Sequence, residues 1–547
     1  MHKGAIVFLA ANASYSHTNL AGWCLRHYAA ATGWEWREIE VVQTDSLAAA
    51  LQKVLNLKPD VLAASFYLFN ANFLLSFIGR FKALKPDCRV IGGGPEFLGD
   101  NFRLLERHPE INAVIRGEGE LAFGAWLACW NKPEQWREIK GLCAFIGEDY
   151  VDNGQAETVK NLDEIPSPYE HNLSAFKKPF LLLETSRGCS NHCAFCTSAG
   201  ERPRFFTVAR VRRDLAVIAA SGVKEVRLAD RTFNENRERC LALIKIMRDE
   251  FWDMKFHLEI DPARLSDDTI RELGLAGPGR FHLEVGIQCL RPETQSAIGR
   301  IGPAERSLAA LAKLCRLRGP AVHVDLIAGL PGATFAGLCD DLRVISLMRP
   351  DEIQLELLKV LPGTRLSAER AKWEMTSAPT PPYEVLRTST MSHDDLVSAQ
   401  RLSNLVDWFY NAPELKEPLV ETIEQVGGFF GLFCAFCGDR ALASHAPALE
   451  NRFRMLERFC LLNAPTLVPK LGYAWLKCGL SAQHGICRTT QWKKPLPKEA
   501  VLVEGAGVIK PRRAYLAELD RPYLFVYGSS PARRPGAIYV LEEPVDY

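Results

Sequence analysis

Three cysteines stand close together in the segment Cys189-Ser-Asn-His-Cys193-Ala-Phe-Cys196. Thiolates are the usual protein ligands of iron–sulfur clusters, and a four-iron cubane normally takes one cysteine for each iron. Three cysteines on one loop can therefore hold three irons and leave the fourth open to another ligand. The spacing predicts a four-iron four-sulfur (4Fe-4S) cluster on Cys189, Cys193 and Cys196, with one iron free for a small chelating molecule.

An open iron suits S-adenosylmethionine (SAM), whose amino and carboxylate groups can chelate it. An electron that reaches SAM through the cluster releases a 5′-deoxyadenosyl radical, so the cofactors supply the difficult chemistry. A structural zinc ion fits less well, because it needs a fourth ligand and His192 is too close in sequence to complete a tetrahedron comfortably. A disulfide would leave one cysteine over and need an oxidising compartment. Reduced thiols predict a cytoplasmic location.

The cysteine segment directly follows an apolar run, FLLLETS, that is typical of a β-strand. Further runs follow with amphipathic stretches between them: EVRLAD, KFHLEI, FHLEVGIQ, AVHVDLIAGL and EIQLELL. Strands that alternate with helices predict a parallel sheet, here a partial (β/α)6 TIM-type barrel over residues 180–370. The cysteines then lie at the carboxyl end of a strand, where barrels of this type have their active sites.

An earlier α/β series occupies residues 1–147, with the β-rich runs AIVFLA, REIEVV, DVLAASF, RVIGGG and AVIRGEG. It predicts an open, doubly wound Rossmann-like (flavodoxin-like) domain. Glycines after its fourth and fifth strands permit a ligand to approach the backbone closely. A polar, proline-containing stretch at residues 148–179 predicts a linker. Residues 371–547 have only weak helical patterns, which predict a mostly helical C-terminal region of unassigned fold.

Composition narrows the class of protein. A chain of 547 residues with 47% hydrophobic content is long enough for several domains. Its 66 basic and 65 acidic side chains nearly balance, which removes the usual electrostatic reason to expect nucleic acid or an anionic membrane as partner. We expect no membrane span, because no stretch of about 20 apolar residues occurs. The Rossmann and P-loop nucleotide fingerprints are both missing.

The sequence resembles the radical SAM enzymes with an N-terminal cobalamin-binding domain over roughly residues 1–390. Within them it is similar to a subgroup whose C-terminal region is a domain of unknown function. The strings that carry this resemblance are VIGGGPEF, VIRGEGE, LDEIPSPY, ETSRGCSNHCAFC, DRTFNEN, LEIDP, VGIQ, DLIAGLPG, LKVLPGT and PPYEVL. The resemblance implies hydrogen abstraction from an unreactive carbon and methyl transfer from cobalamin. It also implies a reductant protein, such as flavodoxin or ferredoxin, and a substrate that the sequence does not identify.

The same resemblance implies residues for two of the cofactors. For SAM they are Phe195, Asp230, Arg231, Asn234, Glu259, Gln288, Asp325 and Gly329, with Glu259 near the ribose and Phe195 near the adenine. For cobalamin they are Ser65, Asn72, Gly93, Gly94, Pro95, Glu96, Gly117, Glu118 and Glu120. No Asp-x-His-x-x-Gly motif occurs, so cobalt would lack that histidine as lower axial ligand. Any of these polar residues could instead cap a helix or form a surface pair.

Several alternatives stay open at this point. The enzyme could catalyse a rearrangement, a cyclisation or bond formation without net methylation, or the first domain could have lost its corrinoid. A methylthiotransferase would need a second cluster on the scattered Cys24, Cys88, Cys129 and Cys143. A non-catalytic corrinoid or cluster sensor is a further possibility. Two roles remain undecided between chemistry and packing: hydrogen-atom transfer by Cys289, and a second metal site on Cys434, Cys437, Cys460, Cys478 and Cys487.

Overall fold

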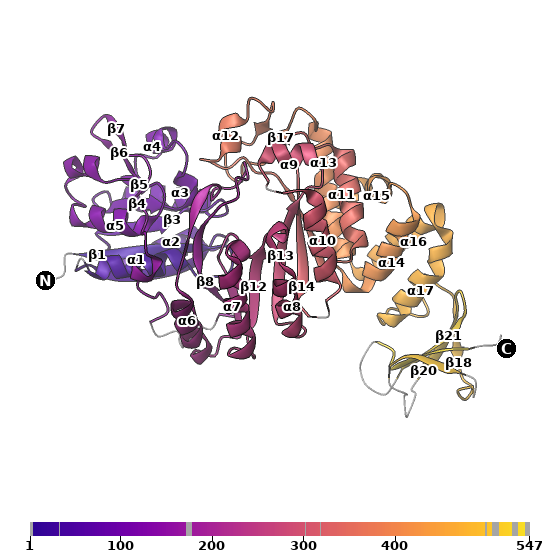
Figure 1. The fold of residues 1–547 in the computed structure, drawn as a ribbon. Helices are drawn as coiled ribbons and strands as arrows, with labels where there is room; N and C mark the ends of the chain where they lie inside the picture. Colours follow the sequence, from indigo (N-terminus) through magenta and orange to yellow (C-terminus); the bar gives the residue numbers. More distant parts are fainter. Residues whose placement is uncertain are drawn as a thin grey trace. The chain divides into compact units, whose positions relative to one another are not determined.

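The computed structural model describes residues 4–31, 33–170, 178–300, 302–317, 319–497, 500–505, 513–527 and 534–541 (Figure 1). The chain forms two compact units. The first comprises Met1–Val322, Gly329–Ala333 and Leu357–His393, and the second comprises His323–Ala328, Thr334–Glu356 and Asp394–Tyr547. Part of the predicted linker, residues 171–177, lies outside the described residues.

The N-terminal sheet has the strand order β2-β1-β3-β4-β5-β6-β7. Its first five strands pair in parallel and its last two antiparallel, which is the flavodoxin-like order extended by a hairpin and confirms the predicted fold. The strands are β1 (Ala5–Asn12), β2 (Glu35–Val42), β3 (Val61–Ser65), β4 (Arg89–Gly93), β5 (Ala113–Ile115), β6 (Leu142–Ile146) and β7 (Asp149–Asp152). The helices are α1 (Leu20–Ala31), α2 (Leu47–Asn56), α3 (Ala71–Leu84), α4 (Phe102–Arg107) and α5 (Gly119–Ala128).

Helices cover both faces of this sheet, so its central strands are apolar throughout. Every residue of β3 is buried, as are all but the first of β1. One core contains Phe77 and Phe81 of α3, and the other contains Phe123 and Trp126 of α5. The two cores hold the carboxyl ends of the strands as a rigid platform for a ligand.

The first domain extends beyond residue 147. Strand β7 lies in the stretch predicted as linker and pairs with β6. Arg116, directly after β5, donates two hydrogen bonds of 2.7 and 2.8 Å to the Asp152 carboxylate and so fastens the end of β7 to the sheet. The strand is short and its ends are exposed, which explains why the sequence showed no clear alternation there.

The second sheet has the order β15-β14-β13-β12-β11-β8. Its six strands with intervening helices confirm the predicted partial barrel. The strands are β8 (Leu181–Leu183), β11 (Glu225–Leu228), β12 (Lys255–Ile260), β13 (Phe281–Gln288), β14 (Ala321–Ala328) and β15 (Glu352–Leu357). The helices are α6 (Val208–Ala220), α7 (Arg237–Asp249), α8 (Asp267–Leu275), α9 (Pro292–Ile298), α10 (Ala304–Cys315) and α11 (Phe335–Leu347).

Alternation along the barrel strands separates an apolar face from a polar one. In β13 the residues Phe281, Leu283, Val285 and Ile287 are buried, while the residues between them are partly exposed. The helices around the barrel begin where a side chain caps them: Thr207, Asn236 and Ser266 accept hydrogen bonds from the first turns of α6, α7 and α8. The loops between strands and helices therefore have defined ends.

A hairpin that the sequence did not predict carries the cysteine segment. Strands β9 (Ser186–Cys189) and β10 (Glu201–Phe205) directly follow β8 and pair antiparallel. The three cysteines extend from the end of β9 into the turn before β10, so the hairpin presents them on a short, doubly anchored loop.

The C-terminal region is helical up to Lys477 and then forms a small sheet. The helices are α12 (Arg365–Glu369), α13 (His393–Leu405), α14 (Pro413–Gln425), α15 (Phe429–Cys437), α16 (Leu449–Asn463) and α17 (Val468–Lys477), with a strand pair β16 (Thr376–Ser377) and β17 (Val385–Arg387). The sheet order is β18-β20-β21-β22-β19, with β18 (Thr489–Trp492), β19 (Val501–Gly505), β20 (Arg513–Glu518), β21 (Pro522–Tyr527) and β22 (Ala537–Val540).

The helical part confirms the prediction for this region, whereas the antiparallel sheet was not predicted. Its edge strand β19 has no buried residue, so it lacks the alternation of a half-buried strand. In the described part of the chain no single helix is long and apolar enough to cross a membrane. One pair, Pro413–Gln425 and Phe429–Leu442, passes that test only when its two helices are counted together across a bend of 117°.

Two glycines of the first domain give a matched test of this packing. A Cβ on Gly141 (φ +80°) would lie 2.5 Å from the backbone N of Ala156, whereas a Cβ on Gly154 (φ +74°) would meet nothing within 4 Å. Gly154→Ala should cost only about 1–2 kcal/mol for the left-handed backbone. Gly141→Ala should cost about 1–3 kcal/mol more, because the backbone must move. Thermal unfolding followed by circular dichroism measures both, and equal losses would contradict the packing described.

Candidate active site

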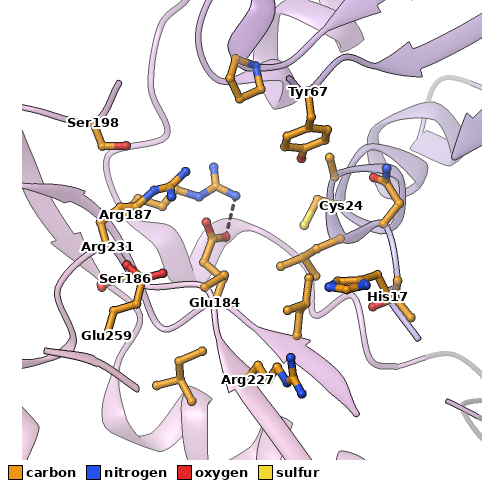
Figure 2. A pocket seen from close by; sticks show the side chains of 18 of the residues that line it. His17, Cys24, Tyr67, Glu184, Ser186, Arg187, Ser198, Arg227, Arg231 and Glu259 are labelled. Carbon is orange, nitrogen blue, oxygen red and sulfur yellow. Dashed lines mark hydrogen bonds and ion pairs between the residues drawn. The ribbon is translucent and has the colours of Figure 1, made fainter. Parts of the chain in front are cut away.

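A cavity of about 670 Å³ lies where the carboxyl edge of the first sheet meets the mouth of the barrel, within the first unit (Figure 2). The first domain contributes residues such as Cys24 of α1 and Tyr67, which follows β3. The hairpin contributes Ser186 and Ser198, and the barrel contributes Glu259. Residues on both sides of the cysteine segment therefore share one cavity with the edge of the N-terminal sheet.

The three predicted cluster ligands are free thiols. Cys189 and Cys193 are buried and Cys196 is half-buried. Burial raises the pKa of the Cys193 thiol, while the nearby guanidinium of Arg300 lowers it. Each sulfur has one polar neighbour: the Thr232 hydroxyl 3.3 Å from Cys189, Nη1 of Arg300 3.9 Å from Cys193, and the backbone N–H of Ser198 3.5 Å from Cys196. Polar contacts of this kind orient cluster ligands and tune the cluster.

Asp230 holds the start of the hairpin in place. Its side chain is fully buried and accepts hydrogen bonds from the backbone N–H and the hydroxyl of both Thr185 and Ser186. Burial raises the pKa of this carboxyl, and the bonds from Thr185 oppose that shift. Asp230 was predicted to bind SAM, whereas the structure buries it beneath the hairpin. Its neighbour Arg231 does line the cavity.

Asn234 also faces inward. Its side chain is 4% exposed and exchanges two hydrogen bonds with the backbone of Asp261, of 2.8 and 3.0 Å. This pair joins the segment after β11 to the end of β12, so Asn234 fixes neighbouring loops to one another. Phe195, predicted to lie against the adenine, is half-buried and stands between Cys193 and Cys196 in the sequence.

Glu259 lies at the carboxyl end of β12 and lines the cavity. Its register partner on β13 is Glu284. The carboxylate Oε2 of Glu284 lies at hydrogen-bond distance, 2.8 Å, from Nε2 of His257. The ring of His257 stacks on that of His282, with centroids 4.5 Å apart. Carboxylates and imidazoles thus occupy the polar face of two neighbouring strands.

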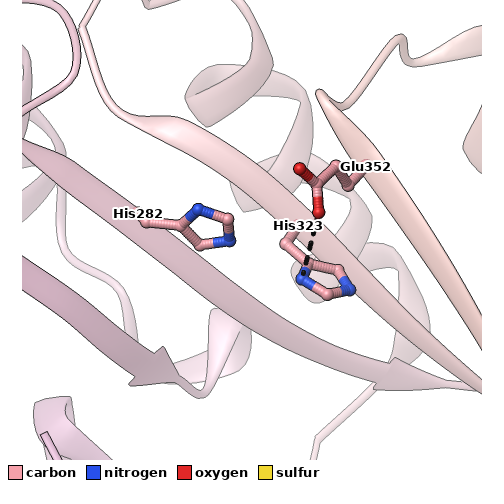
Figure 3. Close-up of side chains that lie close together, drawn as sticks. All are labelled: His282, His323 and Glu352. Atoms are coloured by element: carbon pink, nitrogen blue, oxygen red, sulfur yellow. Dashed lines mark ion pairs between the residues drawn. The ribbon is translucent and has the colours of Figure 1, made fainter. Parts of the chain in front are cut away.

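The remaining predicted SAM residues are Gln288 at the end of β13, Asp325 within β14 and Gly329 directly after β14. Gln288 has a left-handed backbone with φ of 69°, and its Oε1 is buried with no hydrogen-bond partner among the residues that the structure describes. Such strain in a non-glycine residue is common at functional sites. Asp325 lies 3.4 Å from Nε2 of His323, whose Nδ1 is 3.8 Å from Glu352 (Figure 3). Gly329 follows β14 with a positive φ of 86°.

A second cavity of about 150 Å³ lies at the carboxyl ends of β3, β4 and β5. Five predicted cobalamin residues line it: Ser65, Gly93, Gly94, Gly117 and Glu120. A Cβ on Gly94 would lie 2.5 Å from the carbonyl oxygen of Phe66, so only glycine fits there, whereas Gly93 faces open space within 4 Å. This glycine edge fits a flat ligand that must approach the backbone closely.

The other four predicted cobalamin residues have different neighbours. Pro95 and Glu118 line the larger cavity. Asn72 is exposed, and its amide donates a bond of 3.5 Å to the carbonyl of Pro381. Glu96 is buried and accepts a bond of 2.7 Å from the hydroxyl of Tyr383. Asn72 and Glu96 thus contact the segment around residues 381–383, a contact that sequence spacing could not reveal.

Several cavity or cluster neighbours were missed by the sequence reasoning. Arg187 and Tyr67 line the larger cavity, and Arg300 contacts Cys193. Arg187 stands inside the string ETSRGC, so its proximity to the cysteines was a signal that could have been used. The Arg300 contact joins residues far apart in sequence and had no signal.

The cysteines considered for other roles are separated or packed. Cys88 and Cys143 belong to the core on one face of the first sheet, and Cys129 belongs to the core on the opposite face. These thiols cannot hold one cluster together. In the C-terminal region, burial raises the pKa of Cys437 to about 12, as expected for a packed thiol.

Three family models match the chain. A B12 binding domain matches residues 6–127, the Radical SAM superfamily matches residues 183–345, and a protein of unknown function (DUF4080) matches residues 371–471. The chain therefore carries a B12-binding domain, a radical SAM domain and a DUF4080 region, which confirms the three domains that the predicted family implies. A 4Fe-4S cluster, SAM and cobalamin are the cofactors of these domains.

Related proteins agree with this class. An uncharacterised methyltransferase of Pyrococcus horikoshii is 27% identical over 52% of this chain and 63% of its own length. The cobalamin-dependent radical SAM methyltransferase TokK of Streptomyces tokunonensis is 24% identical over 67% of this chain and 59% of its own. The chain thus spans less than two thirds of these relatives. The solved structure of the radical SAM methyltransferase TsrM from Kitasatospora setae has the same fold, with a TM-score of 0.58 at 18% identity over 69% of this chain and 79% of that chain.

Asp230 provides a test of how the hairpin is held. Asp230→Asn should cost about 3 kcal/mol, because an amide nitrogen in place of one carboxyl oxygen cannot accept the buried hydrogen bonds from Thr185 and Ser186. Asp163 is a matched control, since it accepts the backbone N–H and hydroxyl of Thr207 at 3.0 and 2.6 Å at an exposed position. Asp163→Asn should cost less than about 1 kcal/mol. Thermal unfolding and iron retention report the difference, and an equal effect of both variants would contradict the anchoring role.

The ionisation of Glu259 makes stability depend on pH. Burial raises the pKa of Glu259 to about 7, although Arg231 opposes the shift. The folded protein keeps this proton after the unfolded chain has released it, so stability should fall as pH rises from about 4.5 to 7. Glu259→Gln cannot ionise. The gap in melting temperature between this variant and the SAM-free wild type should therefore widen in favour of the variant from pH 4.5 to pH 8, and a constant gap would contradict the assignment.

Proposed function

We propose that the protein is a cobalamin-dependent radical SAM methyltransferase that acts on an unactivated carbon of a substrate still to be identified. The observation that carries the proposal is the shared cavity of about 670 Å³. It is bordered by Gly188 and Ser198 of the cysteine hairpin and by Tyr67 and Glu120 at the edge of the B12-binding domain. A radical source and a methyl donor must reach the same substrate carbon, and one common cavity supports that requirement.

The cluster would be held by Cys189, Cys193 and Cys196. When bound, the cluster and SAM supply a 5′-deoxyadenosyl radical, and cobalamin supplies the methyl group. The protein positions the three thiols through the β9–β10 hairpin and gives each of them a polar neighbour. Because Cys189 and Cys193 are buried, their side chains are largely shielded from water.

SAM would be held by residues from consecutive strand ends of the barrel. Glu259 offers a carboxylate for the ribose hydroxyls, and Arg231 offers a cation at the same cavity. The buried Oε1 of Gln288 could accept a hydrogen bond from SAM. Asp230 and Asn234 act as positioning residues, and Phe195, Asp325 and Gly329 complete the proposed set.

The corrinoid would lie along the glycine edge of the first sheet. Gly93, Gly94 and Gly117 let it approach the backbone, while Ser65 and Glu120 offer polar contacts at the smaller cavity. Pro95 and Glu118 border it from the larger cavity, and Asn72 and Glu96 would support the loop around it through residues 381–383. Because the Asp-x-His-x-x-Gly motif is missing, the chain would offer cobalt no histidine of that motif as a ligand.

The organisation and partners follow from the same proposal. The chain would divide into a B12-binding domain that extends through β7 to residue 152, a linker up to residue 179, the radical SAM core (180–370) and the C-terminal domain (371–547). Radical SAM enzymes need a reductant. A flavodoxin or ferredoxin in the cytoplasm would supply electrons one at a time.

A SAM-cleavage assay tests the proposal without knowledge of the substrate. The wild type, reconstituted anaerobically with iron, sulfide and hydroxocobalamin, should hold about four irons per chain and release 5′-deoxyadenosine from SAM on reduction. The variant Cys189→Ala/Cys193→Ala/Cys196→Ala should do neither. The matched control Cys434→Ala/Cys437→Ala/Cys460→Ala removes three other thiols and should keep the cluster.

The outcomes separate the competing functions. No 5′-deoxyadenosine from the wild type would contradict a radical SAM enzyme and favour a sensor. With a substrate in hand, a product heavier by one methyl group together with S-adenosylhomocysteine supports methyl transfer. Deoxyadenosine without S-adenosylhomocysteine would instead support rearrangement or bond formation without methylation.

A further inference from the structure

The hairpin that carries the cysteines also carries two arginines directly opposite one another. Arg187 on β9 and Arg204 on β10 are register partners. The segment between these two arginines contains all three cysteines, so the two arginines hold the two ends of the cysteine loop.

Both arginines reach out of the radical SAM domain to the B12-binding domain. Nη2 of Arg187 lies 2.6 Å from Glu120 and its Nη1 lies 3.2 Å from Glu118. Arg204 pairs with the same Glu118, and it also donates a hydrogen bond of 2.5 Å to the carbonyl of Val159. Two guanidinium groups on one hairpin therefore hold two carboxylates of the other domain.

These ion pairs are shielded from solvent. The side chains of Arg187, Arg204, Glu118 and Glu120 are 12%, 15%, 19% and 7% exposed. Surface ion pairs contribute little, but loss of one partner from a buried pair leaves an uncompensated charge and is strongly unfavourable. The two domains are thus held in one relative position by interactions that are costly to break.

The carboxylates stand where a corrinoid would be held. Glu118 directly follows Gly117 and is the N-cap residue of α5. Glu120 lies in the first turn of that helix. Glu120 lines both the larger and the smaller cavity. At a helix N-terminus the carboxylate also interacts favourably with the helix dipole, so the start of α5 is a fixed point.

A third carboxylate connects this contact to the barrel. Glu184, at the end of the first barrel strand, lies 2.9 Å from Nη2 of Arg187 (Figure 2). Burial raises the pKa of Glu184, and Arg187 opposes that shift. Arg187, on the hairpin, therefore contacts both the barrel and the start of α5.

We propose that Arg187 and Arg204 form an arginine clamp that sets the distance and orientation between the corrinoid and the cluster. Both are positioning residues, since they act on the ligand-bearing loops of the two domains. The inference rests on the proposed function, because it assumes that the two cofactors address one substrate carbon. Small errors in such geometry are costly to a reaction between two bound groups.

The test uses the cluster-reconstituted protein, with hydroxocobalamin as probe. Arg204→Met removes one arm of the clamp without changing the cavity lining. Arg202→Met is the matched control, because Arg202 is an exposed residue of the same strand. We expect Arg204→Met to weaken hydroxocobalamin binding about tenfold, a typical coupling between sites, and Arg202→Met to leave it within about twofold.

A second readout reports position rather than folding. After reduction, the microwave power saturation of the cob(II)alamin signal in electron paramagnetic resonance (EPR) depends on the distance to the paramagnetic cluster. Arg204→Met should saturate at a different power from the wild type, and Arg202→Met at the same power. If Arg204→Met does not fold, Glu118→Gln breaks the clamp from the other domain and should change both readouts in the same direction.

The outcomes distinguish this inference from the function on which it rests. A wild type that binds no hydroxocobalamin overturns the cobalamin-dependent function and the clamp together. A wild type that binds it, with unchanged affinity and saturation in Arg204→Met and Glu118→Gln, overturns the clamp alone. Equal losses in Arg202→Met and Arg204→Met would also overturn it, since the effect would then reflect net charge.

Discussion

A buried carboxylate anchors the part of the chain on which the proposed chemistry depends. Asp230 accepts hydrogen bonds from the backbone and hydroxyl groups of Thr185 and Ser186, at the start of the cysteine hairpin. A carboxyl group so deeply buried is tolerated only because these donors compensate for lost water. The hairpin therefore starts from a fixed backbone, and residues on both sides of the cysteine segment line the cavity.

The hairpin is fixed on a second side by opposite charges. Arg187 and Arg204 join it to Glu118 and Glu120 of the B12-binding domain, and Glu184 of the barrel shares Arg187. One hairpin thus takes its position from both domains. This arrangement explains how two sheets with separate cores can border a single cavity, and why charged residues at this junction are buried rather than solvated.

The sequence predicted what depends on local pattern. The alternating strands and helices predicted both sheets, and the three cysteines stood out by their spacing. Residues whose role depends on contacts distant in sequence were harder to assign. Asp230 was expected at the cavity but is buried under Thr185, and Glu96 was expected near a corrinoid but bonds to Tyr383.

Other elements were missed because their pattern is weak. Strand β7 is short and polar, and β19 has no buried residue, so neither shows the alternation of a half-buried strand. The ion pairs of Arg187 and Arg204 bring together residues from two domains, and nothing in the local sequence marks their partners. Periodicity reveals elements, while tertiary charge pairing becomes visible only in the fold.

The central claim is that three thiolates hold a 4Fe-4S cluster with one iron open to SAM. EPR spectroscopy of the reduced, reconstituted protein, before and after addition of SAM, tests this claim most directly. The account predicts a signal of a reduced 4Fe-4S cluster that changes in shape when SAM chelates the open iron. A protein that binds zinc in place of the cluster, or a cluster signal that SAM leaves unchanged, would contradict it.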